Sequence, residues 1–147
     1  MDLPKVLETC FQHLANTTSM IDHLDHLVLT TRHEAACVRF YVQVLGMRLE
    51  TFGEGRKAFV FGAQKINLHL AGREFEPKAQ HPTPGALDLC LIASLPLEQV
   101  QAHLAQHGVE VECGPVLRTG AQGAIRSVYV RDPDLNLIEI SEYLPQA

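Results

Sequence analysis

The stretch Leu24-Asp25-His26-Leu27-Val28-Leu29 decides the fold, because Ala86-Leu87-Asp88-Leu89-Cys90-Leu91 repeats its layout. Each is an apolar strand with a polar side chain in its middle, and His26 and Asp88 hold the same place in the two stretches. A glycine follows each of them after 20 residues, Gly46 in the first half and Gly108 in the second. The sequence therefore predicts a structural repeat in which each half opens with a strand and a helix that ends at its glycine.

The other elements repeat in the same order. Hydrophobic periodicity predicts a strand near 23–30, a helix reaching residue 45, and strands at 47–53, 56–62 and 64–71. After a turn-rich connector at 72–85, it predicts a strand at 86–93, a helix at 96–107, and strands near 109–113, 124–131 and 136–143. We therefore expect an α+β fold, in which two βαβββ modules (21–75 and 84–144) form an open, concave mixed β-sheet half-barrel with helices on the outside. This single domain (21–144) follows an N-terminal helical extension at 1–20.

Composition limits the class of protein. A chain of 147 residues, 46% hydrophobic, suits one domain with a substantial core. The net charge of −5 and the scattered basic residues argue against nucleic acid and against a membrane surface as partners. There is no apolar run of about 20 residues and no signal-peptide pattern. Four cysteines without a C-x-x-C motif are typical of reduced thiols, so we expect a cytoplasmic protein.

Four ionisable side chains fall on one face of the predicted sheet. In strands, alternate residues share a face, and each of these four opposes a row of leucines and isoleucines that we expect to pack on the helices. They are His26, His69, Asp88 and Glu139. Imidazole and carboxylate groups suit zinc, nickel, iron and manganese, and such a set leaves positions open for water or substrate. The sequence therefore predicts one divalent metal ion on the concave face.

Simpler explanations apply to each residue alone. A single histidine or glutamate in a strand is more often a surface or ion-paired residue than a ligand. Asp88 is the least certain of the four as a ligand. Its carboxylate could instead hydrogen-bond to a ligand histidine and orient it without binding the metal.

Several motifs, taken in order, resemble the vicinal oxygen chelate superfamily, which includes glyoxalases, bleomycin-binding proteins and extradiol dioxygenases. They are Asp25-His26-Leu27-Val28-Leu29, Phe40-Tyr41, Leu45-Gly46-Met47, Asp132-Pro133-Asp134 and Asn136-Leu137-Ile138-Glu139. More narrowly, the chain resembles the glyoxalase-domain-containing protein 5 group. That group is matched by Phe61-Gly62, Lys65-Ile66-Asn67-Leu68-His69, Glu74-Phe75-Glu76-Pro77-Lys78-Ala79 and Arg118-Thr119-Gly120-Ala121.

The resemblance implies that His26 and Glu139 are metal ligands. It places His69 where glyoxalase I has a glutamate and Asp88 where several members have a histidine. It also implies that Glu139 acts as a base, and that Tyr129 occupies the place of a substrate-side tyrosine, unless Tyr129 is an ordinary strand aromatic. A further departure is Leu135, where the family usually has glycine, so we expect another turn type there.

The site leaves three functions open. The first is a metal-dependent lyase or isomerase of glyoxalase type acting on a small oxygen-rich molecule. The second is a dioxygenase, in which His26, His69 and Glu139 bind iron. The third is a metal-free drug- or metabolite-binding protein of bleomycin-resistance type.

Two further expectations concern the substrate and the assembly. Arg118 and Arg126 flank the glycine-rich stretch 120–123 and are expected to bind an anionic substrate group at a mobile lid, unless they are solvated loop arginines. Edge strands and the apolar N-terminal residues predict a homodimer.

Overall fold

The computed structural model describes residues 19–146, so nearly all of the predicted N-terminal helical extension lies outside the described part. The first half contains β1 (His26–Thr31), α2 (Glu34–Val38), the π-helix η1 (Arg39–Val44), β2 (Arg48–Phe52), β3 (Arg56–Phe61) and β4 (Gln64–Leu70). The second contains β5 (Asp88–Ile92), α3 (Leu97–Gln106), β6 (Cys113–Gly120), β7 (Gly123–Arg131) and β8 (Leu137–Tyr143). None of the helices in residues 19–146 combines the length and apolar character that crossing a bilayer needs.

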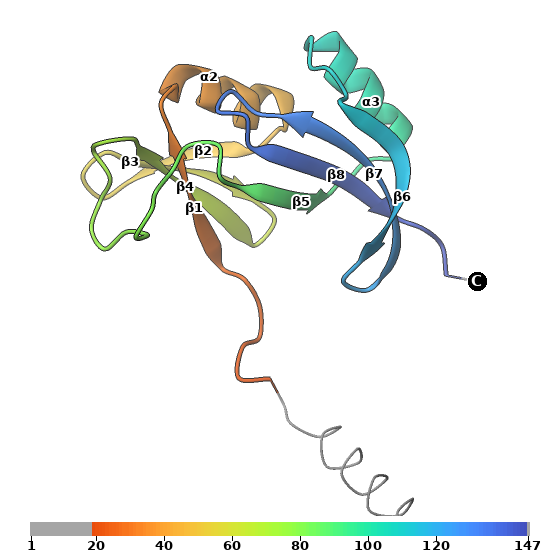
Figure 1. Cartoon of the computed structure of the whole chain (residues 1–147), viewed down its shortest axis with the longest axis horizontal. Coiled ribbons are helices and arrows are strands. Elements are labelled where there is room, and N and C mark those ends of the chain that lie inside the picture. The colour runs from red at the N-terminus through yellow and green to blue at the C-terminus, as the bar shows by residue number, and fades with distance from the viewer. Residues whose placement is uncertain (1–18, 147) are drawn as a thin grey trace, which may run out of the picture.

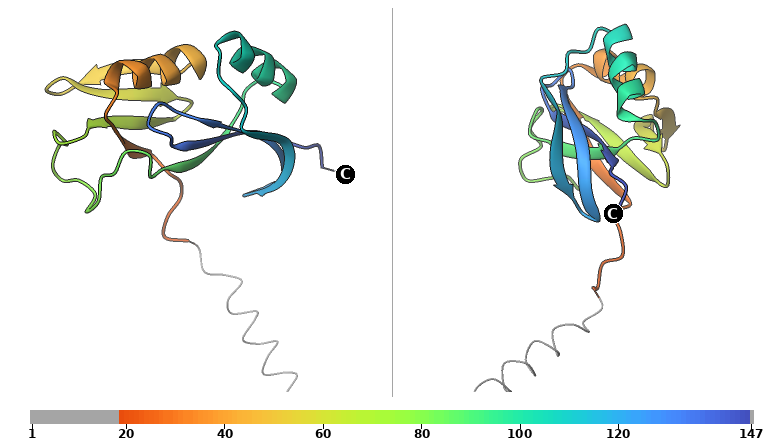
Figure 2. Two further views of the ribbon diagram at one scale, coloured as in Figure 1. Left: turned by 45° about the horizontal axis from the view of Figure 1, so that its top comes forward. Right: turned by 90° about the vertical axis from the view of Figure 1, so that its right-hand side faces the viewer.

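Each half forms its own four-stranded mixed sheet. The strand orders are β1-β4-β3-β2 and β5-β8-β7-β6, so the parallel pair at one edge is β1 with β4 in the first sheet and β5 with β8 in the second. The helices lie on the same side of both sheets, and the opposite faces form an open arc (Figures 1 and 2). The predicted α+β fold of two βαβββ modules is confirmed.

The core lies between the sheets and the helices. Successive residues of a strand point to opposite faces of the sheet, so the neighbours of the concave-face residues point toward the helices and are buried in this core. They belong to one apolar cluster that runs through both modules and includes Leu29, Ile66, Leu68, Ile138 and Ile140. Because the apolar face of each strand is buried against the helices, the polar residues that alternate with it lie on the concave side.

The first predicted helix lies where it was expected, but most of it is a π-helix and not an α-helix. After one turn of α2, the chain continues as η1, in which the Leu45 N–H donates to the carbonyl of Phe40 at 2.9 Å, five residues back. Gly46 follows with a φ of 75°, which is the left-handed conformation that favours glycine. The prediction that Gly46 ends this helix is confirmed.

The strand predicted at 109–113 is wrong. The strand in that region is β6, which begins at Cys113, and the predicted mobile lid is the tight turn between β6 and β7. β6 contains Gly114 and Pro115, which usually argue against a strand. An edge strand tolerates proline because one side of its backbone needs no ladder partner, and β6 is at the edge of its sheet.

One buried carboxylate ties the two modules together. Asp132, between β7 and β8, accepts hydrogen bonds from the Tyr41 hydroxyl at 2.8 Å, the Asn136 side-chain amide at 2.8 Å, and the N–H groups of Asp134 and Asn136, each at 2.9 Å. Tyr41 belongs to η1 of the first module. This turn holds Leu135 at a φ of 69°, so the expected change of turn type is wrong and leucine adopts the left-handed conformation itself.

Candidate functional site

The four predicted ligands lie on the concave faces but not in one cluster. Within residues 19–146, no three histidine, cysteine, aspartate or glutamate side chains come close enough together to hold a metal ion. His26 and His69 belong to the first sheet, and Asp88 and Glu139 to the second. The candidate site therefore consists of two half-sites, one on each module.

The first half-site starts from His26, at the beginning of β1. Its imidazole is about half exposed, and its Nδ1 lies 2.7 Å from the carboxylate of Asp25. This hydrogen bond, as its largest cause, lowers the pKa of Asp25. A carboxylate on one ring nitrogen fixes the imidazole and leaves the other nitrogen to face outward, which is the usual arrangement behind a metal-binding histidine.

The register of β1 and β4 places His69 away from His26. His26 pairs with Lys65, whereas His69 pairs with Thr30, so the two histidines are four residues apart along the strands, roughly 13 Å. Zinc and similar ions bind nitrogen at about 2.0–2.1 Å. The structure thus does not bring His26 and His69 together as ligands of one ion.

The residue that matches Glu139 in the first module is Asn67, which the sequence analysis did not select. Glu139 pairs with Cys90, two residues after Asp88, and Asn67 pairs with Val28, two residues after His26. Asn67 is buried, and its Oδ1 has no hydrogen-bond partner among residues 19–146. The matched places therefore hold one imidazole, two carboxylates and one amide oxygen: His26, Asn67, Asp88 and Glu139.

The second half-site is a row of side chains across its sheet. Tyr129 on β7 pairs directly with Glu139 on β8, and Arg118 on β6 donates a hydrogen bond from Nε to the Tyr129 hydroxyl at 3.0 Å. Desolvation raises the pKa of Tyr129, and the neighbouring Glu139 carboxylate adds to this while Arg118 opposes it. The phenol thus stays protonated near neutral pH, with Glu139 and Arg118 on either side of it.

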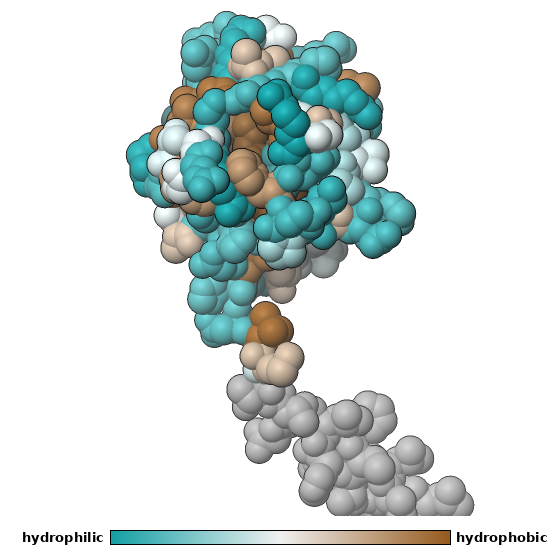
Figure 3. Space-filling view, turned by 90° about the vertical axis from the view of Figure 1, so that its left-hand side faces the viewer, coloured by the Kyte–Doolittle hydropathy of each residue, from teal (hydrophilic) through white to brown (hydrophobic). Residues whose placement is uncertain are grey.

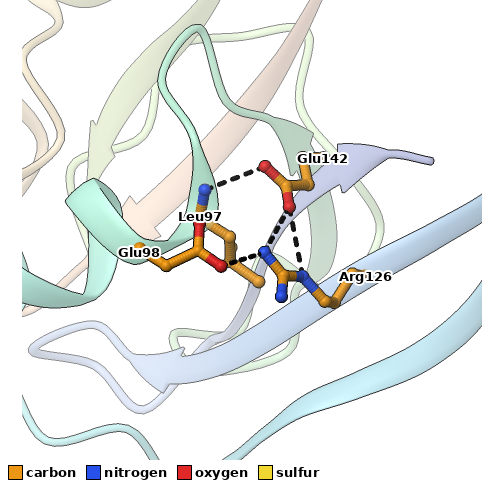
Figure 4. Close-up of polar contacts among 4 residues, drawn as sticks. All are labelled: Leu97, Glu98, Arg126 and Glu142. Carbon is orange, nitrogen blue, oxygen red and sulfur yellow. Dashed lines mark hydrogen bonds and ion pairs between the residues drawn. The ribbon is translucent and has the colours of Figure 1, made fainter. Parts of the chain in front are cut away.

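Arg126 does not join this row. It faces the helix side, where it contacts Glu142 at 2.6 Å and Glu98 of α3 at 2.5 Å, and Glu142 also accepts from the backbone N–H of Leu97 at 2.9 Å (Figure 4). Arg126 and Arg118 are separated because Arg126 pairs across the ladder with Leu117 instead. The structure therefore places Arg126 in an ion-pair network that fastens the start of α3 to the sheet.

Apolar side chains accompany both half-sites on the concave faces. Val28 is 41% exposed on β1 and Ile92 is 51% exposed on β5. Seen from the side of the first module, the surface is hollowed, with an apolar centre and a hydrophilic rim (Figure 3). Concave apolar surface with a few polar groups is typical of small-molecule sites.

The fold defines a class of protein in which paired βαβββ modules present a concave face that carries polar side chains. Residues 23–140 match the model of the glyoxalase/bleomycin resistance protein/dioxygenase superfamily, and the chain belongs to this family.

Two curated relatives are similar over most of the chain. Virulence protein STM3117 of Salmonella typhimurium is 52% identical over 134 residues, which cover 91% of this chain and 93% of that protein. Its crystal structure matches with a TM-score of 0.84 and 55% identity, covering 86% of this chain and all of that one. Glyoxalase domain-containing protein RDO1 of Mycosarcoma maydis is 55% identical over 120 residues, 82% of this chain and 68% of that protein.

Proposed function

We propose that the chain is a divalent-metal-dependent enzyme acting on a small oxygen-rich metabolite. The observation that carries this proposal is the Asp25–His26 pair, which holds an imidazole on the concave face at the place matched by Asp88 in the second module. A role as an ordinary surface residue would not explain why His26 occupies the position that corresponds to Asp88. Superfamily membership supports the same function.

The residues present fit a divalent ion. His26 supplies a nitrogen, while Glu139, Asp88 and Asn67 supply oxygens, and the buried Asn67 Oδ1 is an acceptor without a donor. Such a set suits zinc, nickel, iron or manganese, and its three oxygens favour the harder ions among them. We propose His26 and Glu139 as ligands first, with Asn67 in place of His69 and Asp88 as the fourth.

We propose that a homodimer completes the site. Both concave faces expose apolar side chains beside the half-sites, and exposed apolar surface of this kind marks interaction sites. A two-fold dimer that places the first module of one copy against the second module of its partner would form two equivalent sites. Each site would then combine His26 and Asn67 of one copy with Asp88 and Glu139 of the other.

The chain's own residues suggest the chemistry. A divalent ion held by His26, Asn67, Asp88 and Glu139 would supply Lewis acidity to substrate oxygens. Glu139 is placed to accept a proton, and the Tyr129 hydroxyl, held by Arg118, is placed to donate a hydrogen bond to a substrate oxygen. These roles favour lyase or isomerase chemistry of glyoxalase type. The distance between His26 and His69 removes the geometric support for a two-histidine iron site, and with it the main argument for a dioxygenase.

A metal-free binding protein of bleomycin-resistance type is the second candidate, and the apolar hollow of the first module favours it (Figure 3). Within the superfamily we propose, from the motifs given above, that the chain belongs with the glyoxalase-domain-containing protein 5 group, and we propose a cytoplasmic location.

Metal analysis of matched variants tests the proposal. His23 is also paired with its preceding aspartate, Asp22, but lies before β1, so His23→Ala controls for the loss of an exposed Asp–His pair. We expect purified wild type and His23→Ala to bind nickel, zinc, iron or manganese on titration, and His26→Ala and Glu139→Gln to lose that binding. Equal metal binding by His26→Ala and His23→Ala would contradict the assignment, and a wild type that binds none of these ions would favour the binding protein.

A further inference from the structure

A recess lies on the concave face of the first module, beneath the connector between the modules. Val28, Thr30 and His69 form its floor, and side chains between Pro77 and Leu87 form its roof. Its volume is about 390 Å³, within the range of small-molecule sites. The roof is fastened where the Leu87 N–H donates to the Asn136 side chain at 2.9 Å.

Among the polar side chains that line this recess, which also include Thr30, Lys78, His81 and Thr83, His69 is buried without a partner. Its side chain is 98% buried (2% exposed), and neither ring nitrogen has a hydrogen-bond partner among residues 19–146. The ring meets the edge of Phe75 with 5.7 Å between centroids, so its position is fixed by packing. Buried polar groups in proteins are nearly always hydrogen-bonded, so a ring whose two nitrogens both lack a protein partner is available to a molecule in the recess.

The charges around His69 are predominantly positive. The charged groups near His69 are the cations Arg56 and Lys78 and the acid Glu74. Arg56 stacks on Phe75 at 4.8 Å, and no carboxylate in residues 19–146 forms an ion pair with it. Lys78 lines the recess and pairs with the exposed Glu76 at 3.3 Å.

The acid that acts on His69 is Glu74, whose carboxylate is held by the backbone. Its own backbone N–H and then the Gly72 N–H, at 3.0 Å, lower the pKa of Glu74. An unpaired arginine and a lysine beside a buried donor favour an anionic group. The walls contributed by Val28, Pro82 and Ala86 are apolar and suit a short carbon chain.

We propose that this recess binds the carboxylate end of a small organic acid, with His69 donating a hydrogen bond to one carboxylate oxygen and Arg56 and Lys78 supplying the positive charge. None of the matched positions His26, Asn67, Asp88 and Glu139 is among the residues that line the recess. The recess is therefore separate from the proposed metal ligands, and carboxylate binding there does not require a bound metal ion.

Calorimetric titration with defined probes tests the proposal. The probes are lactate, pyruvate and succinate, with the uncharged lactamide and succinamide as matched controls, each added to the full chain in the presence of a chelator. We expect at least one carboxylate to bind and neither amide to do so. His69→Leu should weaken that carboxylate at least about tenfold, the loss expected for a hydrogen bond to a charged group. His26→Ala should bind it as the wild type does.

Thermal unfolding of His69→Leu provides the second readout. Leucine fills much of the same space without polar atoms, so the variant should fold and melt at or above the wild-type temperature. No binding of any probe carboxylate at millimolar concentration would overturn the proposal, as would equal binding of acids and amides. Clear destabilisation by His69→Leu would also overturn it, because the imidazole would then serve the fold. Loss of metal in His26→Ala with carboxylate binding intact would show that the two sites are separate.

Discussion

Replacing Tyr41 by phenylalanine should weaken the link between the two modules. The Tyr41 hydroxyl supplies one of four hydrogen bonds to the buried Asp132 carboxylate, and both residues are almost fully buried. Phenylalanine keeps the ring and its stacking on Phe59, at 4.9 Å between centroids, so packing changes little. A hydrogen bond to a buried charged group is worth about 1.5–3 kcal/mol, so we expect Tyr41→Phe to lower the free energy of unfolding by about 2 kcal/mol.

Urea unfolding followed by circular dichroism measures this loss. For a chain of this size, about 2 kcal/mol corresponds to a melting temperature lower by about 4–8 °C, with an unchanged denaturant slope. Tyr143→Phe is the matched control, because its exposed hydroxyl accepts only a 3.3 Å hydrogen bond from the Gln122 N–H and its loss should cost less than about 0.5 kcal/mol. Equal stabilities of the two variants would refute the claim that Asp132 depends on Tyr41.

Three further changes have expected outcomes. Leu135→Gly should raise the free energy of unfolding by about 0.5–1 kcal/mol in urea titrations, because it relieves a left-handed leucine, and Leu135→Ala should not. The pKa of His69 is lower in the folded chain than in the unfolded chain, so on acidification the unfolded chain takes up the proton at a higher pH. The free energy of unfolding should therefore fall as the pH drops below about 6.5. His69→Leu should reduce this pH dependence in melting curves recorded from about pH 7.5 to about 5.5. Glu142→Gln should cost about 1–2 kcal/mol by losing charge-assisted contacts to Arg126 and to the Leu97 N–H, whereas Glu98→Gln, at the exposed end of the network, should cost less.

Most of the fold could be predicted because its strands alternate strongly. Burial of the leucine and isoleucine rows fixes the faces of β1, β4, β5 and β8, and the sequence shows those rows directly. β6 was missed because it is an edge strand with mostly exposed residues, so no apolar row marks it. Gly114 and Pro115 are compatible with an edge strand, but in a sequence these residue types usually indicate a loop.

The site could be predicted only in part, because the sequence gives the face of a strand but not its register. Lys65, Asn67 and His69 share the concave face, and hydrophobic alternation does not distinguish among them. Histidine was selected for its metal chemistry, whereas the register of β1 with β4 matches Asn67 to Glu139. Arg126 lies inside the strand predicted at 124–131, which matches β7, and its pairing with Glu142 on β8 places it on the helix side, away from a substrate site.

The proposed site between two copies of the chain is tested most directly by mixing two inactive variants. His26→Ala retains Glu139, and Glu139→Gln retains His26, so each homodimer should lack metal while the mixed dimer regains one intact site. The measurement is metal content of the mixed dimer, purified by two different affinity tags after coexpression. We predict one metal ion per mixed dimer and none in either parent. A mixed dimer without metal, beside a wild type that binds it, would contradict a site shared between copies.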